Sequence, residues 1–181
     1  MLSATKLTLL CLCSITLLMS LKCKKEYVFP EETQAGLNTF GCKVDGKIWV
    51  PGGRPFRGPE LSAAYGNVGS RHYFGVHATD NSSYDFTVVQ FGGDSIEVAE
   101  NTVYPLAKPG KGNFYGEYVE TTDNFYRPFQ TNNISRGEVR ITKFDLLNKI
   151  VAGTFWFTAV DTTTGKKVDI TEGRFDMKFN Q

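Results

Sequence analysis

The sequence predicts an all-β fold, a single antiparallel β-sandwich or barrel-like domain of about nine or ten strands. Apolar and polar residues alternate in many short segments after residue 38, and turns rich in Gly, Asp and Asn separate these segments. No segment keeps a helical period over three turns. Short loops between neighbouring strands favour antiparallel pairing. A sandwich and a barrel both protect the strand edges, and the sequence does not choose between them.

The first expected element is a hairpin over residues 39–50. Its turn contains Asp45-Gly46, a strong hairpin signal when alternating residues flank it. A two-residue turn sets Cys42 opposite Trp49 and brings a lysine onto the apolar face. A three-residue loop instead sets Cys42 opposite Ile48 and keeps that face apolar, so we prefer this second register.

The middle of the chain combines a long loop with a series of short strands. Residues 51–70 are rich in Gly and Pro, and their only helix-like piece is Glu60–Tyr65, which is too short to be stable alone. The strands expected after this loop are Arg71–Thr79, Tyr84–Phe91, Ser95–Val98, Thr102–Leu106, Asn113–Glu120, Phe125–Gln130 and Gly137–Asp145.

The clearest alternation lies in the C-terminal third. Phe155, Phe157 and Ala159 alternate with polar residues or Trp156, and a second alternating run follows the turn Thr162–Gly165. A four-residue loop at this turn predicts a hairpin that sets Ala159 opposite Val168 and Phe157 opposite Ile170.

The apolar residues of the last segment change parity along the chain. They fall on even positions up to Ile170 and on odd positions from Phe175 onward. Because a shift of one residue sends every side chain to the other face, the chain needs a tight turn or a bulge between them. Gly173 is the expected place.

The first 22 residues are predicted to be a signal peptide. Lys6 gives a positive start, and an apolar run of 14 residues extends from Thr8 to Leu21. This run is shorter than the ~20 residues that a bilayer-spanning helix needs, and it fits the core of an export signal.

Cys23 directly follows the apolar run and precedes a polar stretch. This order resembles a bacterial lipoprotein signal, whose first mature residue is a diacylated cysteine, although Lys22 stands where such signals favour a small residue. We therefore expect a lipid on Cys23, a flexible tether within residues 23–38, and the all-β domain over residues 39–181. The alternative is ordinary signal cleavage near Ser20.

Cys42 is the only cysteine of the predicted domain. If Cys23 carries lipid, Cys42 has no partner in the mature chain, and we interpret it as a small buried apolar residue rather than a nucleophile. If Cys23 carries no lipid, a Cys23–Cys42 disulfide is open to an exported chain.

Two segments resemble an uncharacterised family of Bacteroidetes lipoproteins that contains a domain of unknown function. They are ETQAGLNTFGCKVDGKIWVP (Glu32–Pro51) and KIVAGTFWFTAVDTTTGKKVDITEGRFD (Lys149–Asp176). The resemblance implies a location and domain limits, and it supplies no catalytic or binding residue.

Charge and residue content argue against several function classes. The chain has 20 basic and 19 acidic residues and a net charge of +1, so it lacks the basic footprint of a nucleic-acid binder. His72 and His77 are the only histidines. Residues five apart on a regular strand point to opposite faces, which disfavours a shared metal ion. We expect no metal, no cofactor and no catalytic residue.

Aromatic residues are the best candidates for a binding surface. Six of them fall within residues 114–129, and we expect most of these to lie in the core. In the preferred registers the two tryptophans lie opposite the apolar face, as part of a second buried face or as a surface platform. The candidate ligand-facing aromatics are Trp49, Tyr118, Tyr126 and Trp156.

These observations predict a non-enzymatic binding or interaction module of the cell envelope, held as an outer-membrane lipoprotein. Its expected partners are the membrane, through the lipid, and a carbohydrate, peptide or envelope-protein ligand. The alternative is a lipocalin-like carrier with an apolar cavity for a small ligand. An enzyme is the third interpretation, and it requires a histidine in a cleft beside carboxylates. The sequence does not identify the ligand.

Overall fold

The computed structural model describes residues 28–54, 61–122 and 125–181. All regular elements in these ranges are strands, which confirms the all-β prediction. None of the residues in these ranges forms a helix long and apolar enough to cross a membrane. The predicted signal peptide and Cys23 lie outside the described residues.

Eleven strands form one antiparallel sheet that is not closed into a barrel. Its main path runs β2-β1-β11-β10-β8-β7-β5-β4-β3, with β9 paired to β10 and β6 paired to β9. The strands are β1 (Thr39–Val44), β2 (Lys47–Trp49), β3 (Leu61–Val68), β4 (Arg71–Asp80), β5 (Phe86–Asp94), β6 (Thr102–Pro105), β7 (Phe114–Thr122), β8 (Phe125–Gln130), β9 (Gly137–Asp145), β10 (Ile150–Val160) and β11 (Lys167–Lys178).

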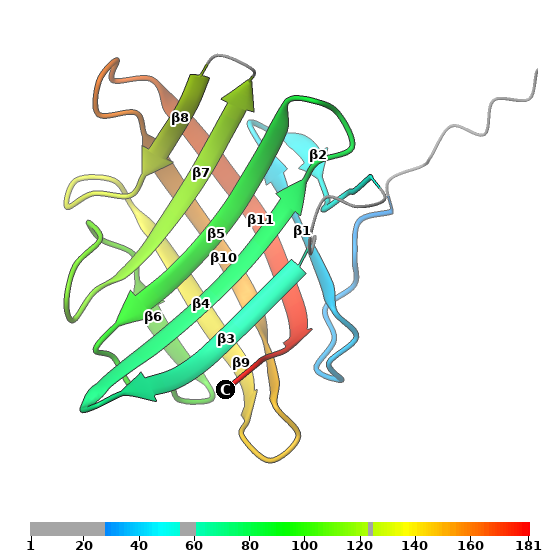
Figure 1. The fold of residues 1–181 in the computed structure, drawn as a ribbon, viewed down its shortest axis with the longest axis vertical. Coiled ribbons are helices and arrows are strands. Elements are labelled where there is room, and N and C mark those ends of the chain that lie inside the picture. Colours follow the sequence, from blue (N-terminus) through cyan, green and yellow to red (C-terminus); the bar gives the residue numbers. More distant parts are fainter. Residues whose placement is uncertain (1–27, 55–60, 123–124) are drawn as a thin grey trace, which may run out of the picture.

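The sheet divides at β10 and becomes two layers. β9 pairs with β10 from Ile150 to Phe157, whereas β8 pairs with it only at Val160. Figure 1 shows β3, β4, β5, β7 and β8 crossing in front of β9, β10 and β11. The chain end then returns to β3, where the backbone of Asn180 makes two hydrogen bonds of 2.9 Å. The architecture is therefore sandwich-like, with the core between the layers.

Phenyl rings fill the space between the layers. Phe155 of β10 lies at their centre, with ring centroids 5.1 Å from Phe40, 4.9 Å from Phe91 and 6.3 Å from Phe175. All four side chains are almost completely buried. Each buried aromatic side chain removes a large apolar area from water, so this cluster supplies much of the driving force that joins the layers.

The C-terminal hairpin has the predicted register. Ala159 pairs with Val168 and Phe157 pairs with Ile170, and the loop closes through the Asp161 N–H, which donates to the Lys166 carbonyl at 2.9 Å. Since these four apolar residues are all buried, the alternation in the sequence marked the core face correctly.

The predicted bulge is present in β11. Phe157 pairs with Ile170 but Phe155 pairs with Gly173, so two residues of β11 face Trp156 alone. Glu172 takes the left-handed backbone conformation, with a φ of 53°. Gly173 is needed for another reason, because a Cβ there would lie 2.5 Å from the Phe155 ring. The bulge makes β11 one continuous strand with both halves facing the core.

The preferred register of the first hairpin was wrong. Cys42 pairs with Trp49, and the turn is the two-residue Asp45-Gly46, whose φ angles of 48° and 77° suit a type I′ turn. This register was disfavoured because it brings Lys47 onto the apolar face. Lys47 lies at the turn and is exposed, so its charge is not buried. Trp49 is only 9% exposed and donates its indole N–H to Thr87 Oγ1 at 2.8 Å, so it belongs to the core.

Two local predictions of the middle segment were also wrong. Residues 51–70 were expected to form a loop, but Leu61–Val68 are β3, because these eight residues pair with β4 and this pairing outweighs their weak local preference for a helix. Ser95–Val98 is not a strand, since the left-handed φ of Ser95 (61°) ends the extended conformation of β5.

Residues 29–37, which the sequence analysis assigned to the tether, lie against β11 and are called the strap here. The buried carboxylate of Asp176 accepts hydrogen bonds from Thr33 Oγ1 at 2.7 Å and from the backbone N–H groups of Ala35, Gly36 and Leu37 at 2.7–3.3 Å. Burial raises the pKa of this carboxyl, but these hydrogen bonds outweigh burial and hold the pKa below the ordinary value. Asp176 therefore fixes the strap to the sheet.

Replacing Asp176 should loosen the strap in a pH-dependent way. Asp176→Asn removes the charge that four donors share, so we expect it to lower the free energy of unfolding by about 2–3 kcal/mol at pH 7. A depressed native pKa stabilises the fold above the unfolded value of about 3.9, and this contribution is lost as the pH falls through the lower native pKa. Urea unfolding at pH 7 and at pH 2.5 measures the difference.

The control is Asp169→Asn on the same strand, where an exposed carboxylate accepts one side-chain hydrogen bond, from Thr158. It should cost less than about 1 kcal/mol. An Asp176→Asn protein as stable as the parent at pH 7, or a difference that stays constant to pH 2.5, would contradict this account.

Candidate functional site

The best candidate site is centred on Trp156, on the outer face of β10. Its neighbours Phe155 and Phe157 point into the core, and the alternation of the strand sends the indole outward. Trp156 is 41% exposed, whereas both phenylalanines are buried. An exposed indole in the middle of a sheet face, away from any edge, offers a flat apolar surface to a ligand.

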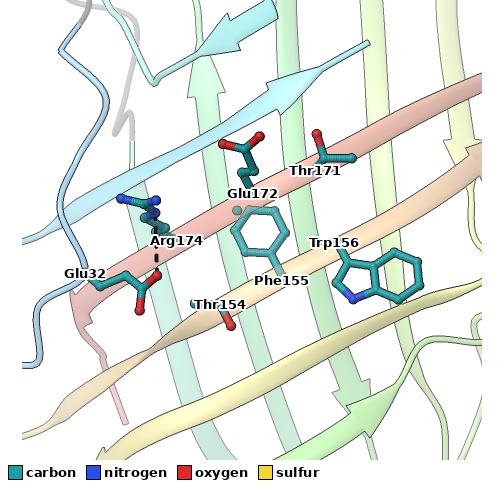
Figure 2. A pocket seen from close by; sticks show the side chains of 8 residues that line it. Glu32, Thr154, Phe155, Trp156, Thr171, Glu172 and Arg174 are labelled. Atoms are coloured by element: carbon teal, nitrogen blue, oxygen red, sulfur yellow. Dashed lines mark ion pairs between the residues drawn. The ribbon is translucent and has the colours of Figure 1, made fainter. Parts of the chain in front are cut away.

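The bulge of β11 shapes the surface on one side of this indole. A cavity of about 380 Å³ lies there. Figure 2 shows side chains that line it, with Trp156 and Thr154 on β10 and Thr171, Glu172 and Arg174 on β11. Because the bulge places two residues of β11 opposite Trp156, it widens the spacing of side chains there. We call this cavity the strap half of the Trp156 groove.

The strap forms one wall of this half. Arg174 Nε lies 3.8 Å from Glu32 Oε1, and its guanidinium donates to the Pro30 carbonyl at 3.1 Å. The same guanidinium lies over the ring of Phe29, 4.7 Å from its centroid. On the far side Glu172 accepts a hydrogen bond from Lys43 Nζ at 2.6 Å. The charged groups of the strap half are therefore paired within the protein.

A second cavity, of about 530 Å³, lies on the other side of Trp156, and we call it the loop half of the groove. Trp156 lines both halves, so a ligand could extend across the indole from one to the other. Both volumes fall in the range that small-molecule sites occupy. The residues that line the loop half besides Trp156 are Asn132, Ile134, Ser135, Arg136, Thr158, Val160 and Lys167.

The loop between β8 and β9 is held in place by its own hydrogen bonds. Asn132 Oδ1 accepts from the N–H groups of Ile134 and Ser135 at 2.8 and 2.7 Å, and the Asn132 N–H donates to Ser135 Oγ at 2.7 Å. The Arg136 carbonyl then accepts from the Thr158 N–H at 3.0 Å, which ties the loop to β10. The wall of the loop half is thus preorganised rather than free to collapse.

The four candidate aromatics lie in different environments. Trp49 and Tyr118 are members of the core cluster, and burial raises the pKa of Tyr118 to about 12. Tyr126 of β8 is 67% exposed but lines neither half of the groove. Of the four, Trp156 alone contributes to it.

The two histidines do not share a site. The pairing of β4 with both neighbours is regular, so His72 shares the face of the buried Phe74 while His77 points outward. The His77 ring is engaged by Gln90 Oε1 at 2.9 Å and by Thr79 Oγ1 at 2.8 Å. Within the described parts of the chain, no group of three or more His, Cys, Asp or Glu side chains could hold a metal ion.

Cys42 lies in the core with no exposed surface, as predicted. Burial raises the pKa of its thiol far above the ordinary value, because the low-dielectric surroundings penalise the thiolate. A thiol that stays protonated and inaccessible is not a nucleophile, so its role here is packing.

Sequence reasoning found the indole of this groove but not its walls. The walls come from the strap, the bulge and the loop before β9, which are far apart in the chain. The parity change before Phe175 was the one available signal, since it located the bulge. Nothing in the local sequence marks Arg136 or Lys167 as neighbours of Trp156.

Comparison with known proteins gives a partial family match. Residues 95–177 match a domain of unknown function, DUF6252. This segment includes Trp156 and the second of the two segments whose resemblance was described above, whereas the segment Glu32–Pro51 lies outside the match. No curated protein and no solved structure matches the chain. The chain is therefore similar over residues 95–177 to a domain whose function is unknown.

Proposed function

We propose that this protein is a non-enzymatic binding module of the cell envelope, an outer-membrane lipoprotein that is anchored through Cys23 and binds its ligand in the Trp156 groove. The observation that carries the proposal is the exposed indole shared by two adjoining cavities. Carbohydrate, peptide and envelope-protein ligands all exploit such exposed aromatic surfaces.

The lipid anchor is inferred from the sequence around Cys23. The strap then limits how far the domain can lie from that anchor. Asp176 and Arg174 hold the chain against β11 from Phe29 onward, and Cys23 precedes Phe29 by six positions. Six residues span at most about 20 Å. A lipid on Cys23 would therefore keep the strap half of the groove close to the membrane surface, and two or more acyl chains are enough for stable attachment.

Binding explains the site better than catalysis does. The groove holds one aromatic platform, several hydroxyl groups and charged side chains at its rim, which are the parts of a recognition surface. Neither histidine lines either half. The paired Arg174 and Glu32 lie on the surface and form an ion pair, an arrangement that positions the strap without supplying an acid or a base.

The structure does not favour the lipocalin-like carrier. A carrier needs an apolar cavity inside the fold, whereas here Phe40, Phe91 and Phe155 meet at centroid distances of 4.9–5.1 Å in the middle of the core. Rings in direct contact leave no room for a ligand at that point.

The anchor predicts acylation at one residue. Cells that express the full-length chain and are fed radiolabelled palmitate should label the protein and retain it in the membrane fraction. Cys23→Ala should abolish the label and release the protein, with Cys42→Ala as the matched control that stays labelled. An unlabelled parent protein found free in the medium would contradict the anchor and leave the groove proposal standing.

The groove predicts a loss of ligand on removal of the indole. On arrays of glycans and peptides, Trp156→Ala should reduce the affinity of any bound class at least about 30-fold, since truncation of a central aromatic anchor costs about 2 kcal/mol or more. Tyr126→Ala, which removes an exposed aromatic outside the groove, should leave binding unchanged. Urea unfolding should show that both variants are close to the parent in stability.

Binding that Trp156→Ala leaves intact would contradict the assignment of the site. If Trp156→Ala binds the same ligands as the parent and Tyr126→Ala binds none of them, the site would instead lie on β8.

A further inference from the structure

The two halves of the Trp156 groove differ in their charge balance. In the strap half Arg174 pairs with Glu32, and Glu172 pairs with Lys43. In the loop half Arg136 and Lys167 form no ion pair with any residue in the described ranges. No acidic side chain lines this half. The loop half therefore carries two positive charges that form no ion pair, beside an exposed indole. Glu138 of β9 pairs with Trp156 across the sheet but does not line the cavity.

The carboxylate on the adjoining part of β11 does not neutralise these charges. Asp169 accepts a hydrogen bond from Thr158 Oγ1 at 2.7 Å, and its backbone N–H donates to Asp45 Oδ1 at 2.9 Å, at the turn of the first hairpin. Asp169 does not line the cavity. A ligand that brings its own negative charge would thus find two cations that no carboxylate of the described residues holds in an ion pair, which is electrostatic complementarity of the kind that selects partners.

The backbone around the indole limits the ligand to side-chain contacts. β10 pairs with β11 on one side, and β9 pairs with it on the other as far as Phe157. β10 therefore has a neighbouring strand on each side at Trp156, and an extended peptide cannot add as a further strand there. The groups that remain available are an indole face, the lone pairs of Thr158 Oγ1, whose proton goes to Asp169, and the N–H donors of the Asn132 side-chain amide, whose oxygen is used within the loop.

This combination suits a polyhydroxylated ring with an acidic group. The C–H face of a pyranose can lie on the indole, its hydroxyl groups can donate to Thr158 Oγ1 and accept from the Asn132 side-chain N–H, and Arg136 can hold a carboxylate or a sulfate through two parallel N–H donors. Lys167 adds a second positive charge from β11. A cavity of about 530 Å³ has room for one or two such rings.

Building on the binding function proposed above, we infer that the ligand of the loop half is an anionic saccharide, with its sugar ring on Trp156 and its carboxylate or sulfate on Arg136 and Lys167. The shared chemistry is a pyranose bearing a negative charge. Uronic acids and sulfated sugars both supply it, and the experiment below separates them.

The test uses the purified full-length protein and isothermal titration with three pairs of tetrasaccharides: galacturonate against galactose, glucuronate against glucose, and sulfated against unsulfated galactose. At low salt at least one acidic member should bind about 10-fold or more tightly than its neutral partner, because a charge-assisted contact contributes at least about 1.4 kcal/mol. The advantage should shrink at 0.5 M salt, where the Debye length falls to roughly 4 Å and the charges are screened.

The variant Arg136→Gln/Lys167→Gln should remove the preference for the acidic member and keep the weaker binding of the neutral one. The matched control Lys47→Gln/Lys108→Gln makes the same change in net charge at exposed lysines outside both halves of the groove and should bind like the parent. Which pair shows the preference tells a carboxylate ligand from a sulfate ligand.

Equal affinity for the acidic and neutral members of every pair would overturn the inference, and so would a glutamate-rich peptide that binds more tightly than every acidic saccharide. In both cases binding that still depends on Trp156 leaves the proposed function intact. If no saccharide and no peptide binds in a way that Trp156→Ala weakens, both proposals fail together.

Discussion

The bulge in β11 is the constraint on which the rest of this structure depends. A strand buries every second side chain, so a segment whose apolar residues change parity cannot serve one core without an extra residue. Val168 and Ile170 precede the bulge, and Phe175 and Met177 follow it, yet all four are buried between the same two layers. One added residue thus allows the apolar side chains of both halves of β11 to face the same core.

The same bulge links the core to the outer surface. On the inner side, the missing side chain of Gly173 makes room for the Phe155 ring at the centre of the aromatic cluster. On the outer side, the extra residue faces Trp156, and the side chains around it open into the strap half of the groove. β-Bulges are enriched beside functional sites because they redirect side chains in this way.

Residues beyond the bulge also organise the chain that precedes the domain. Arg174 and Asp176 are two residues apart on the outer face of β11, and both engage the strap. The groove, the strap and the core therefore share one strand. A change in the register of β11 would displace all three, which is why local packing and the candidate site cannot be treated separately in this fold.

Local sequence signals predicted the parts of the structure that depend on neighbouring residues. The alternation around Phe157 and Ile170 and the length of the loop between them fixed the C-terminal hairpin, and the parity change located the bulge. The predicted register of the first hairpin was wrong because Lys47, which that register keeps off the apolar face, lies exposed at the turn. The decisive contact of Trp49, its hydrogen bond to Thr87, joins residues 38 positions apart.

The remaining features depend on contacts between distant segments. β3 forms because β4 pairs with it, although its own residues favour a short helix. The walls of the groove meet only after the sheet has folded over, since they come from the strap, from the loop before β9 and from β11. Single-sequence patterns identify the outward direction of Trp156, but they carry no information on which charged residues surround it.

The register across the bulge is the most direct test of this account, and nuclear Overhauser effects between backbone protons of β10 and β11 measure it. The account predicts that Thr158 lies opposite Asp169 and Thr154 lies opposite Arg174, with Glu172 in a left-handed conformation between them. A ladder without a shift, in which Thr154 lies opposite Gly173, would contradict it. That result would turn Phe175 away from the core and remove the structural basis of the groove.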